Sequence, residues 1–297
     1  MKTNSNSVKG IILLLSSALL YSTMPVLIRI LGGGGLPPMS QVFLRYVFAF
    51  LSASVYYFFI SKSKVKIEKK DWGLMLVATI FGYSLTGLFF TYGILLTSVG
   101  NALFLFYTFA ILAPILGFFF LKDKINVANI VSLVISLIAL ALLFSPNSIP
   151  TWKIGGFFAL MASLSQSTYL IIRKKLHKYP ANLMMFVNTL AGVIVLGTMS
   201  IVFENSFYFS GGISHVSNNV WVTTVIFGII NFLAWFTMTK GFEYFKATAG
   251  SIILLSELVF GIFFAFLFFK EIPTIATAIG GVLILVSSTL VIMKGES

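Results

Sequence analysis

Two ionisable side chains stand inside long apolar runs of the sequence. Glu257 lies near the middle of a run over residues 248–269, and Arg45 lies near the start of a run over residues 40–60. An ionisable group at such depth in a membrane costs roughly 2.5–3.5 kcal/mol on insertion scales, so it usually faces a cavity or a partner. Glu257 could bind a substrate ammonium group or a coupling proton, or it could be a structural carboxyl between helices. Arg45 could attract an anionic substrate group, pair structurally, or reach the lipid headgroups.

Uncharged polar and aromatic side chains inside other apolar runs are a second group of candidates. Asn231 and Trp235 are four residues apart, a spacing that places them on one face of a helix. An amide and an indole on one face could bind the polar and flat parts of a small organic molecule, although Ser, Thr and Asn side chains also join helices in membranes. The candidate substrate-binding residues are Glu257, Asn231, Trp235, Tyr83, Gln166, Tyr169, Thr108, Ser256, Thr23 and Arg45.

The sequence gives little support for cysteine chemistry, metal binding or nucleotide binding. The absence of cysteine excludes disulfides, thiolate catalysis and cysteine-based metal sites. The two histidines, His177 and His215, fall in expected loops on opposite sides and lack the spacing of metal ligands. The glycines at 32–35 lack the lysine and Ser/Thr of a phosphate-binding loop, which favours an outer turn. We therefore expect no cofactor and no metal.

The composition indicates a chain that lies in a membrane. Hydrophobic residues make up 58% of the 297 residues and charged residues only 9%, with a mean hydropathy of +1.01. Soluble domains have about 45–50% apolar and about 25% charged residues, so this chain has too few charges to cover a surface in water. The net charge of +12 does not indicate nucleic-acid binding, because the charges sit in short connections between apolar runs.

The apolar runs have the length that a membrane-spanning helix needs, roughly 20 residues. Gly/Pro turns and charged loops separate them, and the first run reads as a retained helix rather than a signal peptide. With the N-terminus in the cytoplasm, the inner loops hold 16 Lys and Arg residues and the outer loops hold three. This bias predicts that both termini are cytoplasmic. The ten expected spans are 9–30, 40–60, 72–93, 100–121, 126–145, 153–172, 182–203, 219–240, 248–269 and 273–293.

The two halves of the chain, residues 8–145 and 153–293, resemble each other. At an offset of 148 residues, Thr91 matches Thr239, and Lys122–Asp123 matches Lys270–Glu271; the offset is 145 near the start of each half. Five spans per half is an odd number, so the halves cross the membrane in opposite senses. Inverted repeats of this kind are typical of secondary transporters, whose substrate site lies near the midplane. We expect an all-α polytopic membrane protein of ten helices in two inverted five-helix repeats.

The stretches from Gly100 to Asp123 and from Ala249 to Glu271 carry a resemblance to a known family. Each has a small-residue start, an apolar helix and a closing acid, and the chain resembles a ten-helix member of the drug/metabolite transporter superfamily with two tandem EamA domains. That family often has Glu-Pro fourteen residues before the second closing acid. Glu257 has this spacing here, but Leu258 replaces the proline, and Phe109 occupies the corresponding Glu position in the first half.

The resemblance implies a site between the first, third and fourth helices of each half. Members of the drug/metabolite transporter superfamily transport amino acids, metabolites, nucleotide-like compounds and drugs. We therefore expect a monomeric or homodimeric exporter of a small metabolite, such as an amino acid, in a bacterial cell membrane, with protons as a candidate coupling ion and no nucleic-acid partner. No ATP-binding motif is present, so active transport would be secondary. The alternative is an integral-membrane enzyme or a channel that acts on small polar or lipid-like molecules.

Overall fold

The computed structural model describes residues 5–61, 65–97, 99–122, 127–143, 153–204, 217–245, 247–269 and 274–294. Every regular element in these ranges is a helix, which confirms the all-α expectation. Two π-helical segments, η1 (Tyr56–Ile60) and η3 (Val77–Ser84), and a short 3-10 turn, η2 (Lys69–Asp71), accompany the α-helices. The α-helices are α1 (Ser5–Tyr21), α2 (Met24–Gly33), α3 (Pro38–Val55), α4 (Trp72–Leu76), α5 (Leu85–Leu96), α6 (Val99–Phe106), α7 (Phe109–Leu121), α8 (Val127–Leu143), α9 (Lys153–Lys175), α10 (Ala181–Glu204), α11 (Asn218–Gly241), α12 (Ala247–Leu254), α13 (Ser256–Phe269) and α14 (Ile275–Lys294).

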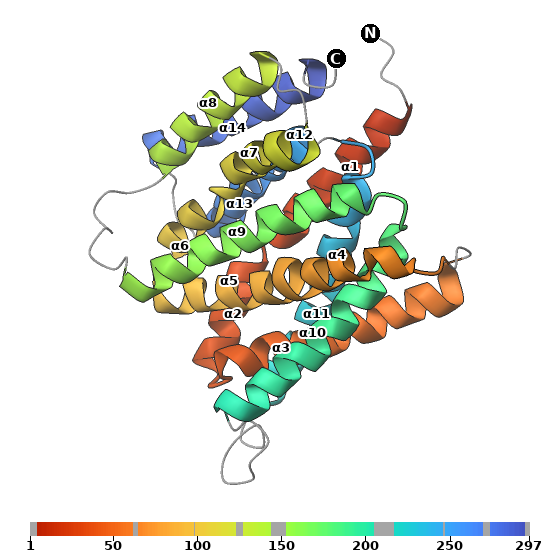
Figure 1. Ribbon diagram of the computed structural model, residues 1–297. Helices are drawn as coiled ribbons and strands as arrows, with labels where there is room; N and C mark the ends of the chain where they lie inside the picture. Colours follow the sequence, from red (N-terminus) through yellow and green to blue (C-terminus); the bar gives the residue numbers. More distant parts are fainter. Residues whose placement is uncertain are drawn as a thin grey trace.

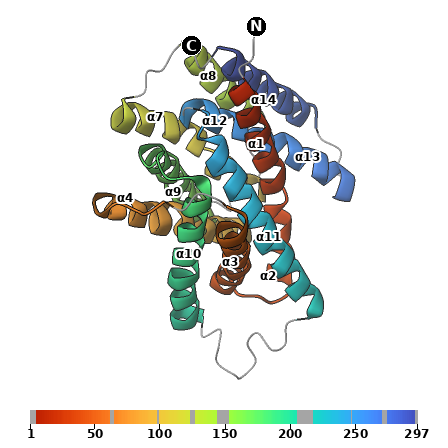
Figure 2. The same ribbon diagram turned by 90° about the vertical axis from the view of Figure 1, so that its right-hand side faces the viewer.

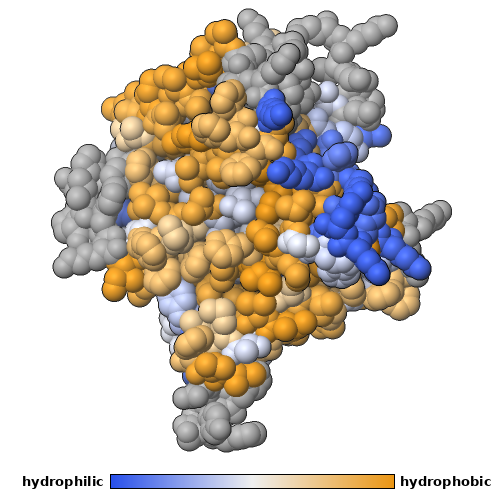
Figure 3. Space-filling view, in the orientation of Figure 1, coloured by the Kyte–Doolittle hydropathy of each residue, from blue (hydrophilic) through white to orange (hydrophobic). Residues whose placement is uncertain are grey.

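Seven helical segments are long and apolar enough to cross a membrane. They cover Ser7–Gly33, Pro38–Ile60, Lys69–Leu96, Asn101–Leu121, Ile154–Lys175, Ala181–Glu204 and Asn218–Gly241. Three shorter apolar helices, Val127–Leu142, Ala249–Phe264 and Ala278–Leu290, occupy the positions of the other expected spans. The surface in Figure 3 is apolar over most of its area, as expected for contact with lipid rather than water. The chain is therefore a multi-pass membrane protein.

The packing of the helices repeats when the two halves of the chain are exchanged. We number the ten apolar segments in chain order: segment 1 is α1 and α2, 2 is α3 and η1, 3 is α4, η3 and α5, 4 is α6 and α7, 5 is α8, 6 is α9, 7 is α10, 8 is α11, 9 is α12 and α13, and 10 is α14. Segment 1 packs on segment 8, through α1 and α11, and segment 6 packs on segment 3, through α9 and α5 (Figures 1 and 2). Segments 1 and 9 are in contact, and so are segments 6 and 4. The equivalent segments 2 and 7, 4 and 9, and 5 and 10 pack against each other.

Three of the expected continuous spans are interrupted near their middles. The first breaks between α1 and α2, where the hydroxyls of Ser22 and Thr23 donate to the carbonyls of Leu19 and Leu20 at 2.6 and 2.7 Å. Hydroxyl groups that bond to nearby carbonyls weaken the regular helical pattern. Segment 4 breaks between α6 and α7 at residues 107–108, and segment 9 breaks between α12 and α13 at Leu255. The last two breaks lie 148 residues apart, so they are equivalent in the repeat.

Charged side chains gather at one end of the molecule. Figure 3 shows hydrophilic residues on the side where, in Figure 1, the α3–α4 connection and the C-terminal end of α9 lie. Exposed charged residues there include Lys66, Glu68, Lys69, Lys175 and Lys178. We call this the basic end. The start of α1 and the end of α14 lie at one end of the molecule, opposite the end of α10 and the start of α11 (Figures 1 and 2).

Candidate functional site

The three helix breaks surround one cavity in the interior of the bundle. Each break contributes a lining residue on either side, such as Tyr21 and Met24 at the break between α1 and α2. The cavity has about 490 Å³ of space that is not filled by atoms, counted with its open side. Its lining residues are Tyr21, Met24, Arg45, Thr86, Gly87, Phe90, Phe106, Phe109, Gln166, Asn231, Trp235, Met238, Leu254 and Glu257.

The lining is built largely from pairs of residues that are equivalent in the two halves. Gly87 and Trp235, Phe90 and Met238, Phe106 and Leu254, and Phe109 and Glu257 are each 148 residues apart, and Tyr21 and Gln166 are 145 apart. An inverted repeat places equivalent residues on opposite walls around its axis. The cavity therefore lies where the two halves meet. In two of these five pairs, Tyr21 with Gln166 and Phe109 with Glu257, an aromatic residue of the first half corresponds to an amide or carboxyl residue of the second.

Glu257 supplies a carboxyl group to this cavity from the first turn of α13. The residue is 6% exposed, and the Tyr107 hydroxyl, which is buried and makes no hydrogen bond of standard geometry with the described residues, lies near its carboxyl group. Peptide dipoles at the start of a helix favour an anionic group there, which offsets part of the cost of burial. The break before α13 thus lets segment 9 present a carboxyl in the middle of the bundle.

Arg45 supplies a guanidinium group from α3. Its side chain is 2% exposed, so its head does not reach the lipid headgroups. Nη2 donates to the Gly87 carbonyl at 2.9 Å, and the guanidinium lies 4.7 Å from the ring centre of Phe227 and 5.4 Å from that of Tyr46. Gly87 makes this approach possible, because a Cβ atom there would lie 2.8 Å from Nη2. No ion pair within 4.0 Å joins Arg45 to an acid among the described residues.

Asn231 and Trp235 line the cavity from one face of α11, as their spacing predicts. The Oδ1 atom of Asn231 is buried and has no hydrogen-bond partner in the described structure. The Trp235 ring is held edge-on by Tyr83 and Tyr169, with ring centres 4.5 and 5.0 Å apart. Gln166 lies across from them on α9, where Nε2 donates to the sulfur of Met238 at 3.3 Å.

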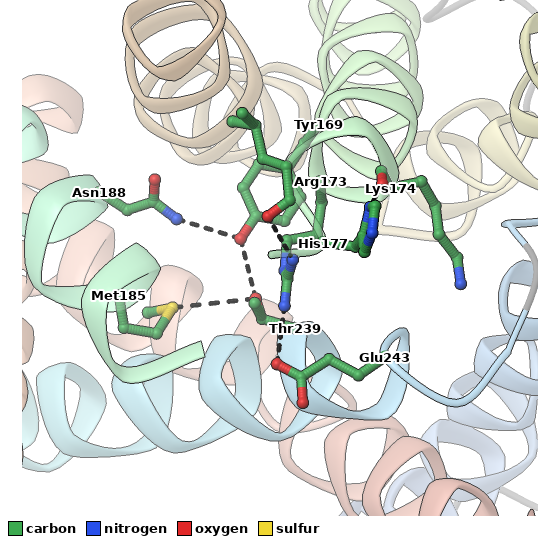
Figure 4. Close-up of polar contacts among 9 residues, drawn as sticks. Tyr169, Arg173, Lys174, His177, Met185, Asn188, Thr239 and Glu243 are labelled. Carbon is green, nitrogen blue, oxygen red and sulfur yellow. Dashed lines mark hydrogen bonds and ion pairs between the residues drawn. The ribbon is translucent and has the colours of Figure 1, made fainter. Parts of the chain in front are cut away.

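A polar network closes the bundle between the cavity and the basic end. Tyr169 follows Gln166 by three residues on α9, and its hydroxyl shares a 2.8 Å hydrogen bond with Thr239 and accepts one of 3.1 Å from Asn188 Nδ2 (Figure 4). One turn further along α9, Arg173 Nη2 donates at 2.7 Å to Oε1 of Glu243, which lies just after the end of α11. Because Tyr169, Thr239 and Asn188 are fully buried, the cavity is sealed on this side.

A second ionic cluster lies at the surface of the basic end. The Lys178 ammonium pairs with Asp71 at 2.7 Å and with Glu68, and the Tyr179 hydroxyl donates to Asp71 at 2.7 Å. Hydrogen bonds from Lys178 and then Lys70 hold the pKa of the exposed Glu68 carboxyl below its usual value. Hydrogen bonds to Asp71 and Glu68 raise the pKa of Lys178 above its usual value. These contacts join the α3–α4 connection to the turn between α9 and α10.

The cavity brings together five of the ten candidates from the sequence: Glu257, Arg45, Asn231, Trp235 and Gln166. The other five do not line it. Tyr83 and Tyr169 hold the Trp235 ring, Thr108 bonds to Leu105 and Ser163, Thr23 bonds to Leu20, and Ser256 is buried beside the break in segment 9. No group of three or more metal-ligating side chains occurs among the residues that the structure describes.

Sequence reasoning missed most of the aromatic and apolar lining, including Tyr21, Phe90, Phe106 and Phe109. The repeat carried the signal for them, because Tyr21 and Phe109 are the equivalents of Gln166 and Glu257. A search for polar side chains alone passes over such partners.

Comparison with known proteins gives consistent results. The model of the EamA-like transporter family matches residues 8–145 and 153–293. An uncharacterized transporter of Clostridium kluyveri is 26% identical over 293 residues, which cover 95% of this chain and 92% of that protein. An uncharacterized transporter of Synechocystis sp. is 23% identical over 76% of this chain and 66% of its own length. A crystal structure with 17% identity has a TM-score of 0.73 over 97% of this chain and 98% of its own, so it shares the fold.

Proposed function

The chain belongs to the EamA-like transporter family, and on that premise we propose that it is a secondary transporter that exports a small metabolite, such as an amino acid or a related amphipathic compound, by alternating access. Membership in this family confirms the resemblance to drug/metabolite transporters and implies a membrane transporter rather than an enzyme. Substrate class, direction and mechanism are our proposal. They rest on the composition and position of the cavity.

The arrangement of helix contacts supports two inverted repeats of five membrane-crossing helices each. A two-fold axis in the membrane plane exchanges equivalent segments, so a contact between segments 1 and 8 requires one between 6 and 3. Both contacts occur, and segments 2 and 7 as well as 5 and 10 pair with each other, as segments close to such an axis must. On this basis we propose ten spans in repeats 8–145 and 153–293, with both termini and the basic end in the cytoplasm.

Five cavity residues are proposed to bind the substrate, each with a distinct role. Glu257 takes the substrate ammonium group or the coupling proton, and Arg45 contacts the opposite end of the substrate. Asn231 and Gln166 offer amide groups, and the Trp235 ring covers the flat or apolar part. The five candidates outside the lining act indirectly: Tyr83 and Tyr169 fix the indole, while Thr23, Thr108 and Ser256 lie at or beside the helix breaks.

The proposed transport cycle begins from a conformation in which the polar network is closed. In this conformation the Tyr169–Thr239–Asn188 hydrogen bonds and the Arg173–Glu243 ion pair close the cytoplasmic side. Rocking of the two halves about the cavity would break these contacts and admit the substrate from the cytoplasm. The three helix breaks supply joints at the depth where such a movement bends the helices.

The proposal rests mainly on one observation: the broken helices and the residues equivalent in the two halves meet at one cavity, and this cavity contains Glu257. The test is to express the wild type, Glu257→Gln and an empty vector in a bacterial host at matched membrane levels, and to measure extracellular metabolites by mass spectrometry. We expect a solute class that accumulates with the wild type and falls about tenfold or more with Glu257→Gln, because a buried charged contact is lost.

Glu68→Gln is the matched control, because it makes the same acid-to-amide change at an exposed position and should export like the wild type. Equal export by Glu257→Gln and the wild type would show that Glu257 is structural. If the wild type changes no extracellular metabolite, and everted vesicles take up none of the solutes of a host extract, the proposed export is wrong.

A further inference from the structure

Arg45 carries a charge that the described part of the protein leaves uncompensated. Its Nε and Nη1 atoms are buried and have no hydrogen-bond partner, and only Nη2 is bound, to the Gly87 carbonyl. The rings of Phe227 and Tyr46 beside the guanidinium attract its charge, and the Tyr46 hydroxyl also lies next to it, but neither residue gives Nε or Nη1 a hydrogen-bond partner. A buried cation without a paired anion is costly, so this arrangement indicates that a further group binds there.

The unoccupied edge of the guanidinium belongs to a residue that lines the central cavity. Gly87 lies beside it in the lining, and its missing side chain keeps the approach open. The fork of N–H groups in a guanidinium matches the two oxygens of a carboxylate, and such a pair is stronger than a neutral hydrogen bond. Nη2 shares one edge of the guanidinium with Nε and another with Nη1, so the second N–H of Nη2 forms such a fork with one of the two free donors, and Arg45 has the chemistry of a carboxylate site.

Two other polar residues of the lining offer acceptors that suit the other end of such a solute. Asn231 Oδ1 is buried without a partner, and Glu257 contributes a carboxyl group. Arg45 and Glu257 do not form an ion pair although both line the same cavity, so each is available to a bound molecule. A polyanion such as a phosphate ester is disfavoured, because Arg45 is the single basic residue in the lining and Glu257 would repel the additional charge.

We propose that Arg45 is the carboxylate subsite of the cavity, and that the transported solutes carry one carboxylate at Arg45 and a hydrogen-bond donor directed to Asn231 and Glu257. This inference rests on the proposed function for the identity of the cavity as the transport site. It adds the chemical class of the substrate and the orientation in which it binds.

The test measures the binding of a simple carboxylate to the purified full-length protein, independently of transport. Sodium propionate is titrated against the protein in lipid nanodiscs at constant ionic strength, with sodium chloride as the reference salt. Thermal stability and tryptophan fluorescence serve as readouts, because Trp235 lies in the same lining. We expect the wild type to bind propionate, and Arg45→Met to weaken this binding about tenfold or more.

Two further variants keep the test decisive. Arg29→Met removes an arginine outside the lining, whose Nη2 bonds to the Thr97 carbonyl, and it should bind propionate like the wild type. Arg45→Lys keeps the charge but not the fork, and it should bind with intermediate affinity even if Arg45→Met folds poorly. Propionate binding that is absent in the wild type, or equal in the wild type and both Arg45 variants, would overturn the inference.

The outcomes separate this inference from the proposed function. Arg45-dependent propionate binding without export of any metabolite would contradict export alone. Export of solutes that lack a carboxylate, reduced in Glu257→Gln, would contradict the Arg45 subsite while leaving the transporter intact.

Discussion

At the scale of single residues, the cavity contains polar atoms that the fold does not satisfy. Asn231 Oδ1 and two nitrogens of Arg45 are buried without partners, whereas most buried polar atoms in proteins are hydrogen-bonded. Such atoms lower stability and are retained where a ligand completes their bonds. The Oδ1 atom of Asn188 also lacks a partner in the described structure, but its Nδ2 atom donates to Tyr169, so Asn188 makes a formed hydrogen bond between helices.

We predict that replacing Asn231 separates stability from transport. Asn231→Leu removes an unpaired acceptor, so it should leave the free energy of unfolding unchanged or raise it by up to about 1 kcal/mol, while it lowers export. Asn188→Leu is the matched control and should lower stability by about 1 kcal/mol, because it breaks a formed hydrogen bond. Thermal unfolding in detergent measures the stability of the two variants, and the export assay measures their transport. A clear loss of stability in Asn231→Leu would mean that Asn231 is structural.

At the scale of helices, the seal at the basic end joins α9, α10 and α11. Tyr169, Arg173 and Gln166 lie on one face of α9, and Thr239 lies on the face of α11 that carries Trp235. Three lining residues, Gln166, Asn231 and Trp235, therefore stand on the same two helices, α9 and α11, as Tyr169 and Thr239 of the seal. A tilt of α9 against α11 therefore changes the wall of the cavity and the seal together.

We predict that breaking the ion pair opens this side of the cavity. The chain has no cysteine, so Leu254→Cys places a single thiol in the lining. A membrane-impermeant thiol reagent added to inside-out vesicles should label it several-fold faster, on the order of five, when Glu243→Gln is also present. Glu68→Gln in the same background is the control and should not change the rate. Equal rates for all three proteins would exclude the ion pair as part of the seal.

The surface cluster of Lys178 predicts a pH dependence of stability. Because the pKa of Glu68 is lowered in the folded protein, its ion pair stabilises the fold above the usual carboxyl pKa and is lost as the pH falls through the folded value. The melting temperature of the wild type should exceed that of Lys178→Met at pH 7, and this difference should shrink below about pH 4. Lys66→Met, which removes an exposed lysine of the same connection, should show no such convergence.

At the scale of the whole molecule, hydropathy was a reliable guide to where the helices lie. The thickness of a bilayer sets the length of the apolar runs, so the helices fall within a few residues of the expected ranges. Hydropathy did not reveal the breaks at residues 22–23, 107–108 and 255, because the polar residues there, such as Ser22 and Thr23, stand within runs that are apolar overall. The candidates chosen from the sequence include five lining residues, but Tyr21, Phe90, Phe106 and Phe109 were recognised as lining residues only from the packing.

We also predict the topology of the whole chain. Fluorescent protein and alkaline phosphatase, fused in turn to the C-terminus, should give fluorescence and no phosphatase activity, because the excess of Lys and Arg holds this end in the cytoplasm. Fusions placed after α10 should give the reverse result, since α10 ends on the opposite side (Figure 1). Phosphatase activity at the C-terminus would contradict the ten-span arrangement with cytoplasmic termini.

The pairing of Phe109 with Glu257 across the cavity also bears on how such a site can be built. In a homodimer of two identical halves, every residue occurs twice, so a carboxyl on one wall would face a second carboxyl on the other. A cavity with one acid, from the second half, and one base, from the first, cannot be built from identical subunits. A charge asymmetry of this kind therefore requires that the two halves differ in sequence, and each half by itself supplies only one of the two charged groups.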